Sequence, residues 1–302
     1  MKRKVVKHGP SSLTMSLPMN WVKKQHIHSG DELEVTEQGN NLLVSGEGKK
    51  DSKSIDISIS GDKMFVRRLF NMPYLRGYDV MNITFDSYNV MEDIQKNITA
   101  WRGFEIVEQR DKFCKIKCIA ESKPEEVDQM IVRMFNICST LFDEILCYIK
   151  TENEDCLKRM LLIDINMTRI DLFCRRVLNV GKGIEVGKIG SMYAIVRTLE
   201  EISDLAKDVA KSKPKIRSVK KKLFVKILGE LIKSFNLLRA IKHKKEIEPI
   251  YEYKEIKCSL RKMFEKDYQL NKDEMFMFLT LRHLIYEFHD LSEEVILWVD
   301  PK

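Results

Sequence analysis

The sequence predicts an α+β protein of several domains, and three observations support this class. The chain has 302 residues, which is enough for two or three domains. Over residues 1–48 apolar and polar side chains alternate, as in half-buried β-strands. From residue 123 onward apolar residues recur at the helical period of about 3.6 residues. We therefore expect a small β domain at 1–48, a small α/β segment at 54–120 and an all-α region at 123–300.

The N-terminal domain is predicted to contain four short strands and one short helix. Its turns are marked by HGPSS, HSGD and EQGNN. Pro18 suits the first position of the helix, because the N–H that it lacks would be unbonded there. The polar stretch EGKKDSKS predicts a linker after the last strand. The strands are expected at 4–7, 13–17, 32–36 and 42–45, and the helix at 18–24.

This domain is too small to fold alone. About 45 residues in four short strands bury too little apolar surface for independent stability. The sequence there offers neither a disulfide framework nor a metal motif as compensation. Its alternating apolar residues need a partner surface, and the simplest one is a second copy of the same domain. The sequence therefore predicts a homodimer.

The segment 54–120 combines strand-like and helix-like patterns. Helices are expected at 62–75 and 90–101, a strand at 78–85, and a hairpin of strands at 104–108 and 113–120. No chemistry can be identified in this segment, and the sequence assigns it no role beyond spacing or dimer contacts.

The region 123–300 is predicted to form six long helices with short connections, which favours antiparallel packing. The stretch TLEEISDLAKDVA (198–210) aligns without gaps to TLRHLIYEFHDLS (280–292). The region is therefore expected to contain two related three-helix bundles, at 123–212 and 215–300. The first helix is expected to begin at Pro124. The other five are expected to span 154–180, 189–211, 216–243, 250–266 and 273–298.

Composition and charge narrow the classes of protein to which this chain can belong. No apolar run reaches the roughly 18 residues of a membrane helix, and the basic N-terminus lacks the apolar stretch of a signal peptide. The seven cysteines include no Cys-x-x-Cys pair and are read as reduced, mostly core thiols of a cytoplasmic protein, with a metal or redox role as the alternative. The net charge is +7, and residues 211–226 contain no acid. That basic run is a solvated helix face, a contact to a nucleic-acid backbone or a docking surface for an acidic protein.

The N-terminal domain resembles the AbrB/SpoVT/MazE swapped-hairpin family of DNA-binding domains. The resemblance rests on Gly9, Ser11 and Ser12, on Leu17 and Pro18, on Trp21, and on Gly30, Asp31 and Glu32. It implies that basic and small polar residues of the first hairpin meet DNA phosphates and groove edges. The alternative is a solvated edge whose charges discourage strand aggregation. The residues implied to contact DNA are Arg3, Lys4, Lys7, His8, Ser11 and Ser12.

Four carboxylates in the helical region form a candidate cation site. Glu200 and Asp204 are four positions apart and share one helix face, and Asp164 and Asp171 share a face of the preceding helix. If these helices pack antiparallel, the four carboxylates converge. Oxygen ligands of this kind suit Mg, Mn, Fe or Zn. A solvated acidic helix face is the alternative.

The helical region resembles the PhoU family. RTLEEISDLAKDVA (197–210) is similar to that family's Glu-x-x-x-Asp helix, and IDINMTRIDLF (163–173) to the helix before it. The resemblance implies tandem three-helix bundles, a regulator of phosphate uptake, and iron or zinc clusters on the acidic faces. Glu200 and Asp204 are the implied ligands, with Asp164 and Asp171 less securely matched. The second repeat departs from the pattern, because Arg282 and Tyr286 stand where Glu200 and Asp204 stand.

Together the two resemblances match the arrangement of archaeal phosphate-uptake regulators. They imply a homodimeric DNA-binding regulator whose helical bundles sense a metal or a partner protein. The alternative is an adaptor that does not bind DNA and docks on a phosphate transporter or a sensor kinase. No nucleophile–base pair, glycine-rich phosphate loop or acid–base pair is recognisable, so an enzyme is not predicted.

Overall fold

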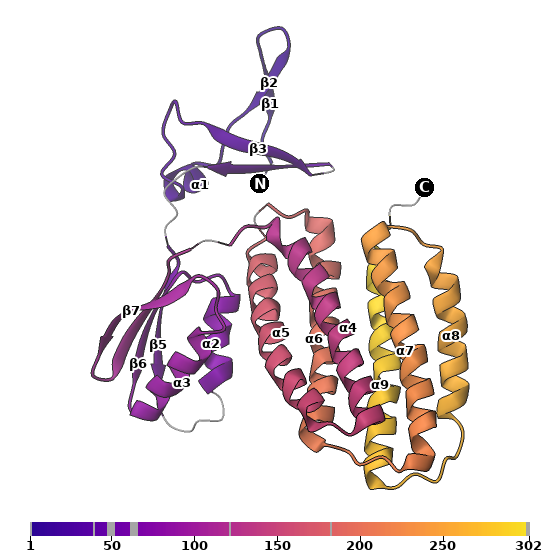
Figure 1. Ribbon diagram of the computed structural model, residues 1–302. Helices are drawn as coiled ribbons and strands as arrows, with labels where there is room; N and C mark the ends of the chain where they lie inside the picture. Colours follow the sequence, from indigo (N-terminus) through magenta and orange to yellow (C-terminus); the bar gives the residue numbers. More distant parts are fainter. Residues whose placement is uncertain are drawn as a thin grey trace. The chain divides into compact units, whose positions relative to one another are not determined.

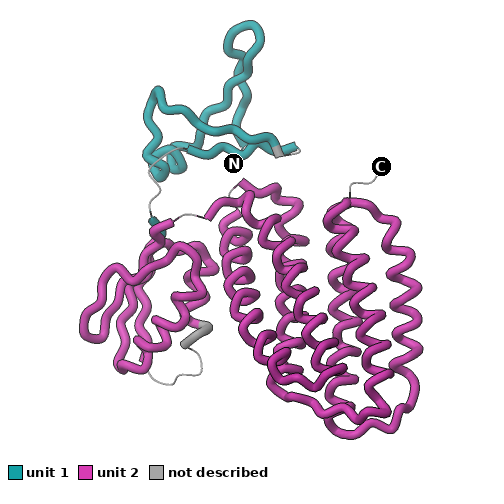
Figure 2. The backbone as a smooth tube through the Cα atoms, viewed as in Figure 1, with its two compact units in different colours: residues 1–53 teal, residues 54–302 magenta. Residues whose placement is uncertain are grey.

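The computed structural model describes residues 2–38, 40–46, 52–60, 66–120, 122–181 and 183–299. The chain divides into two compact units, residues 1–53 and 54–302 (Figure 2). The first unit contains short strands and one short helix, and the second contains a four-stranded sheet and eight helices of at least ten residues among the described residues. The predicted α+β class is confirmed.

The first unit consists of two separate antiparallel hairpins joined by a short helix (Figure 1). The first hairpin turns at Gly9, whose φ of +74° is the left-handed conformation that glycine adopts without a Cβ clash. Pro18 is the residue before the helix rather than its first residue. The elements are β1 (Val5–His8), β2 (Ser12–Met15), α1 (Met19–Lys24), β3 (Leu33–Gln38) and β4 (Asn41–Gly46).

This unit has no core of its own. Among its residues whose side chains are described, none is buried. Alternation places apolar side chains on both hairpins, yet in a single chain Leu13 is 72% exposed, Val35 56% and Leu42 63%. The burial pattern agrees with the expectation from size alone, that these side chains need a surface the single chain does not supply.

The second unit begins with a four-stranded sheet in the order β5-β6-β8-β7. β5 and β6 are parallel, whereas β6, β8 and β7 are antiparallel neighbours. The sequence prediction missed β5, and its predicted helix at 62–75 is described only from Val66. The elements are β5 (Ser54–Ile59), α2 (Val66–Leu75), β6 (Val80–Phe85), α3 (Tyr88–Ile98), β7 (Phe104–Arg110) and β8 (Phe113–Cys118).

Both helices of this layer lie on one side of the sheet (Figure 1). Ile57, Ile83 and Cys114 are paired across neighbouring strands and belong to the apolar core of the layer. Alternation puts polar residues on the opposite face, where Asn82 Nδ2 donates to Asp56 Oδ1 at 2.7 Å. Because only one face of this sheet is buried, apolar and polar residues alternate along its strands.

Six long helices follow as two three-helix groups, as the sequence predicts (Figure 1). Gly181 ends the second of them with a φ of +67°, at the predicted GKG stop. The helices are α4 (Glu126–Thr151), α5 (Glu154–Val180), α6 (Val186–Ser212), α7 (Ser218–Lys244), α8 (Pro249–Phe264) and α9 (Lys272–Ile296).

The two groups share one core. α4 packs against α7 and α6 against α9, while α5 and α8 flank this four-helix centre. Phe135 and Phe142 of α4 contact Phe235 of α7, and Phe288 of α9 completes the cluster with ring centroids 5.1–5.9 Å apart. Within the described residues no helix is long and apolar enough to cross a membrane.

Candidate nucleic-acid interface and acidic cluster

The first hairpin presents every residue that the sequence analysis assigned to DNA contact. Arg3, Lys4, Lys7, His8, Ser11 and Ser12 are all exposed. His8 stands opposite Ser12, whose hydroxyl donates to the His8 carbonyl across the turn. Lys7 stands opposite Leu13, and strand alternation therefore puts Lys7 and His8 on opposite faces of the hairpin. The structure brings His8 and Ser12 together and spreads the cations along the strand.

The charge of this region is of one sign. Residues 2–30 contain six lysines and arginines and no acid, and the first acid is Asp31. Two of these cations, Lys23 and Lys24, lie in the last turn of α1. Asp31 Oδ2 accepts from the backbone N–H of His28 at 2.7 Å and belongs to the turn before β3. The result is a positively charged N-terminal segment of the kind that attracts a polyanion.

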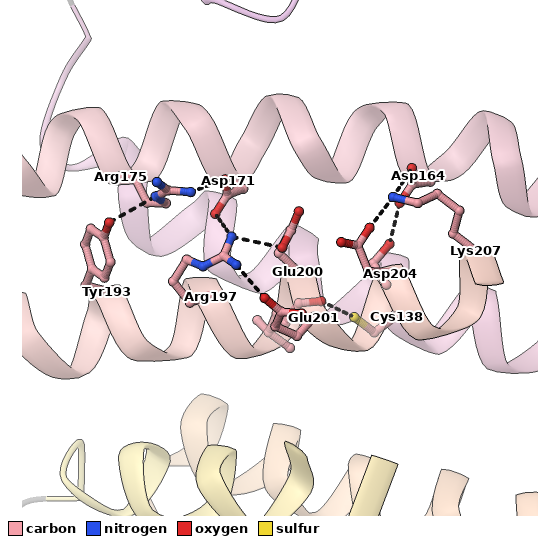
Figure 3. Close-up of polar contacts among 12 residues, drawn as sticks. Cys138, Asp164, Asp171, Arg175, Tyr193, Arg197, Glu200, Glu201, Asp204 and Lys207 are labelled. Carbon is pink, nitrogen blue, oxygen red and sulfur yellow. Dashed lines mark hydrogen bonds and ion pairs between the residues drawn. The ribbon is translucent and has the colours of Figure 1, made fainter. Parts of the chain in front are cut away.

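The four predicted carboxylates converge between α5 and α6 in two groups (Figure 3). In the first group, Arg197 Nη1 lies 3.5 Å from Asp171 Oδ1 and 2.9 Å from Glu200 Oε2. Arg175 donates to the second oxygen of Asp171 at 3.0 Å. Asp171 is 3% exposed. The expectation that Asp171 and Glu200 meet across the two helices agrees with this geometry.

The second group lies one to two turns away along the same helices (Figure 3). Lys207 Nζ is 3.2 Å from Asp164 Oδ2 and also pairs with Asp204. Ser203, which is fully buried, donates to Asp164 Oδ1 at 3.2 Å. Asp164 and Asp204 are thus joined through one ammonium group.

The cluster also reaches a fifth carboxylate that the sequence analysis did not name as a ligand. Glu201 Oε1 lies 2.5 Å from Arg197 Nη2, and Glu200, Glu201 and Asp204 each offer an oxygen within 4.8 Å of the others. Burial, together with the negative charges of Asp171 and Asp204, raises the pKa of Glu200 to about 7. The carboxyl of Glu200 therefore holds its proton to a higher pH than an exposed glutamate does.

The residues fit a divalent cation in charge but not in their present arrangement. Five carboxylates face three basic side chains, which leaves an excess of negative charge for hard oxygen-seeking ions. However, Arg197 and Lys207 stand between the carboxylates, so an ion has to displace at least one of them. Sequence reasoning missed these two cations, although both stand three positions from an acid on α6, a spacing that places them on one face.

The second repeat contains no equivalent of this cluster among its described residues. Arg282 donates to the Tyr286 hydroxyl at 3.4 Å at the positions that correspond to Glu200 and Asp204. The guanidinium would repel a cation there.

Three of the eight lysines and arginines in the basic run 211–226 form ion pairs with acids of the same chain. Lys213 pairs with Glu154 at 2.6 Å, Lys221 with Glu152 at 2.6 Å, and Arg217 with Glu274 at 2.6 Å. Three cations of the run are therefore engaged with acids of neighbouring helix ends. This observation favours a structural role for the run over a contact with nucleic acid.

Comparison with known families gives one match. Residues 6–52 match the family described as MazE_antitoxin, antidote-toxin recognition MazE, bacterial antitoxin. Comparison with curated proteins gave no match, and comparison with solved structures gave none either. The chain therefore carries an N-terminal domain of the MazE/AbrB type, a class that suggests DNA binding, followed by a large helical region.

Proposed function

We propose that this protein is a homodimeric DNA-binding regulator. The observation that carries the proposal is the acid-free basic segment 2–30, most of which lies in a domain that matches MazE. Lysine and arginine displace counterions from DNA phosphates, which supplies affinity, while hydroxyl and imidazole groups at the turn reach groove edges. Lys4 and Lys7 are the phosphate contacts, and His8, Ser11 and Ser12 lie where the turn approaches the duplex.

The exposed apolar side chains of the first unit support the proposed dimer. Its two hairpins pair only within themselves over the described residues, and its apolar side chains remain exposed in one chain. Two copies that exchange these surfaces gain an apolar core, and burying each leucine side chain contributes about 1.5–3 kcal/mol. A dimer also presents two positive hairpins, which suits the two half-sites of a palindromic DNA sequence.

Fluorescence anisotropy with a labelled duplex tests the proposal. We expect the apparent dissociation constant to rise steeply with salt, and each of Lys4→Ala and Lys7→Ala to reduce the slope of log K against log salt by about one per subunit. Lys254→Ala, which removes an exposed cation of α8, is the matched control and should leave the slope unchanged. Equal slopes for all four proteins contradict the proposal.

The helical bundles are the proposed sensor, and the signal that they detect is proposed to be linked to phosphate supply. The support is the resemblance of 163–173 and 197–210 to the PhoU family, together with the convergence of Asp164, Asp171, Glu200 and Asp204 between α5 and α6. A divalent iron or zinc ion is the proposed effector, held by Glu200, Asp204 and the adjacent Glu201. Elemental analysis of the purified protein and of Glu200→Gln, with Glu230→Gln on α7 as control, tests this part. Equal metal content in all three proteins contradicts it.

The second candidate function is an adaptor that docks on a phosphate transporter or a sensor kinase without contacting DNA. The observation that favours it is the intramolecular pairing of three of the eight cations in the run 211–226, which leaves less of its charge for DNA contact. In this function the first unit only dimerises. The salt dependence of DNA binding separates the two candidates, because an adaptor lacks phosphate contacts.

A further inference from the structure

Two cysteines meet at the corner between α4 and α5. Cys147 lies in the last turn and a half of α4, and Cys156 is the third residue of α5. Their sulfur atoms are 2.6 Å apart, whereas a disulfide bond is about 2.05 Å long. Cys147 is half-buried and Cys156 is fully buried. The turn between the helices therefore already places the two thiols for a bond, and Cys147 is the less buried of the two residues.

Charged neighbours surround the pair. Arg159 Nη2 lies 3.4 Å from Cys156 Sγ, and the same guanidinium holds both oxygens of Glu144, at 2.6 and 2.7 Å. Burial, and after it the hydrogen bond with Cys147, raises the pKa of Cys156 to about 11, while Arg159 acts in the opposite direction. Cys156 is therefore a thiol at rest and becomes easier to ionise once Cys147 no longer bonds to it.

We propose that Cys147 and Cys156 form a redox-active dithiol, which small-molecule disulfides oxidise to an intramolecular disulfide. The assignment of roles follows from burial. Cys147 is the sulfur that an external disulfide can reach, and Cys156 is the sulfur that resolves the intermediate. No element of the proposed DNA-binding function is needed for this inference.

The reaction is a pair of thiol–disulfide exchanges. The Cys147 thiolate attacks one sulfur of the external disulfide, forms a mixed disulfide and releases one thiolate. The Cys156 thiolate then attacks Cys147 Sγ, forms the Cys147–Cys156 bond and releases the second thiolate. The pair loses two electrons and two protons, and the external disulfide becomes two thiols. Arg159 assists the second step by favouring the Cys156 thiolate.

A metal site is the competing use of the same residues, and the geometry disfavours it. Glu144, Cys147 and Cys156 each offer a ligand atom within 4.8 Å of the others. However, Arg159 occupies both oxygens of Glu144 and places its positive charge beside Cys156. A guanidinium in that position repels a cation and stabilises a thiolate, which favours exchange chemistry.

The bond would form where the two three-helix groups are joined. Glu152 and Glu154, in the same corner, pair with Lys221 and Lys213 at 2.6 Å each. The Tyr148 hydroxyl donates to the carbonyl of Pro214 at 3.1 Å. Oxidation therefore links α4 covalently to α5 at the corner that contacts the connection between α6 and α7. The disulfide bond changes the stability of this junction.

The test uses the full chain, reduced and then equilibrated in buffers of rising ratio of oxidised to reduced glutathione. Free thiols are alkylated, and tryptic peptides are analysed by mass spectrometry. We expect the peptides 134–150 and 151–158 to become joined by a disulfide as the ratio rises, with the intact mass lower by two hydrogens. Seven alkylated cysteines at every ratio would overturn the proposal, and so would a disulfide that maps elsewhere.

Variants distinguish the two roles. The background is Cys258→Ser, because Cys258 is exposed and would itself react with glutathione. In this background Cys156→Ser should accumulate a glutathione adduct on Cys147, whereas Cys147→Ser should show neither an adduct on Cys156 nor a disulfide. An adduct on Cys156 reverses the assigned roles and overturns them. Stoichiometric zinc that is retained on purification and lost in Cys147→Ser also overturns the proposal, in favour of a metal site.

Discussion

Arg176 of α5 places Nη2 2.9 Å from Oδ1 of Asp79, a residue 97 positions earlier in the chain. The other terminal nitrogen of the same guanidinium donates to the carbonyls of Tyr74 and Tyr78, at 2.6 and 3.0 Å. Tyr74 belongs to the last turn of α2, whose carbonyls lack the usual intrahelical donors, and Tyr78 lies in the turn that follows the helix. One buried side chain therefore joins the α/β layer to the helical bundles.

Replacing Arg176 should loosen this junction. Arg176→Met removes one donor to the Tyr74 carbonyl, the donor to the Tyr78 carbonyl and the ion pair with Asp79, so we expect the free energy of unfolding to fall by about 2–4 kcal/mol. Urea unfolding followed by circular dichroism measures the change. Arg133→Met, which makes the same substitution at an exposed position of α4, is the control. A loss no larger than that of the control would show that the guanidinium contributes little.

Glu274 should make stability depend on acid pH. Its side chain is fully buried, and its hydrogen bond with Arg217 holds its pKa at about 2, against 4.5 in an unfolded chain. A lowered pKa means that the stabilisation is complete above about pH 4.5 and is lost as the pH falls toward 2. We expect Glu274→Gln to cost about 2 kcal/mol at pH 7 and much less near pH 2.5. Urea midpoints of both proteins across this range provide the measurement.

Glu200 should have the opposite pH dependence. Its pKa of about 7 lies above the value of 4.5 for an unfolded chain, so its contribution is complete below about pH 4.5 and is lost as the pH rises through 7. Between about pH 5 and pH 8, the stability difference between Glu200→Gln and the wild type should shift in favour of the variant by about 2–3 kcal/mol. Glu201→Gln, at a side chain that is 51% exposed, is the control for a general charge effect. A pH-independent difference for Glu200→Gln contradicts the assigned pKa.

The oligomeric state should respond to a single charge in the first hairpin. If the proposed dimer buries Leu13, then Leu13→Asp removes at least about 3 kcal/mol from the two copies together, which raises the dimer dissociation constant about 100-fold or more. Analytical ultracentrifugation measures this constant. Val219→Asp, at an apolar residue of α7 that is 80% exposed, is the control and should leave it unchanged. Unchanged association in Leu13→Asp would contradict a dimer formed through this hairpin.

The long helices were predictable because each buries one face, and apolar residues recur on that face with the helical period over many turns. The end of α5 at Gly181 was found for the same reason, since a glycine stop is a local signal. The strand β5 was missed, although SIDISI alternates, because the polar residues before it read as a linker. Its strand character depends on pairing with β6, which lies beyond any local window.

Four of the five carboxylates of the acidic cluster were predictable, but Glu201 and the arrangement of the cluster were not. Helical spacing was enough to place Glu200 and Asp204 on one face, and antiparallel packing brought Asp164 and Asp171 to them. The cations between them were not anticipated, because which acid an arginine or lysine pairs with depends on side-chain geometry across two helices. The Cys147–Cys156 pair was missed because its spacing of nine residues resembles no known motif, and a helical corner brings the sulfur atoms together.

The phenylalanine cluster at the centre of the helical region has a consequence for biosynthesis. Phe135 and Phe142 leave the ribosome well before Phe288, which belongs to the last helix. Until α9 has emerged, the nascent chain exposes the apolar side chains of α4 and α6 that α9 covers in the folded protein. Exposed apolar surface of this kind favours aggregation, so a product that stops short of α9 is expected to aggregate rather than to fold.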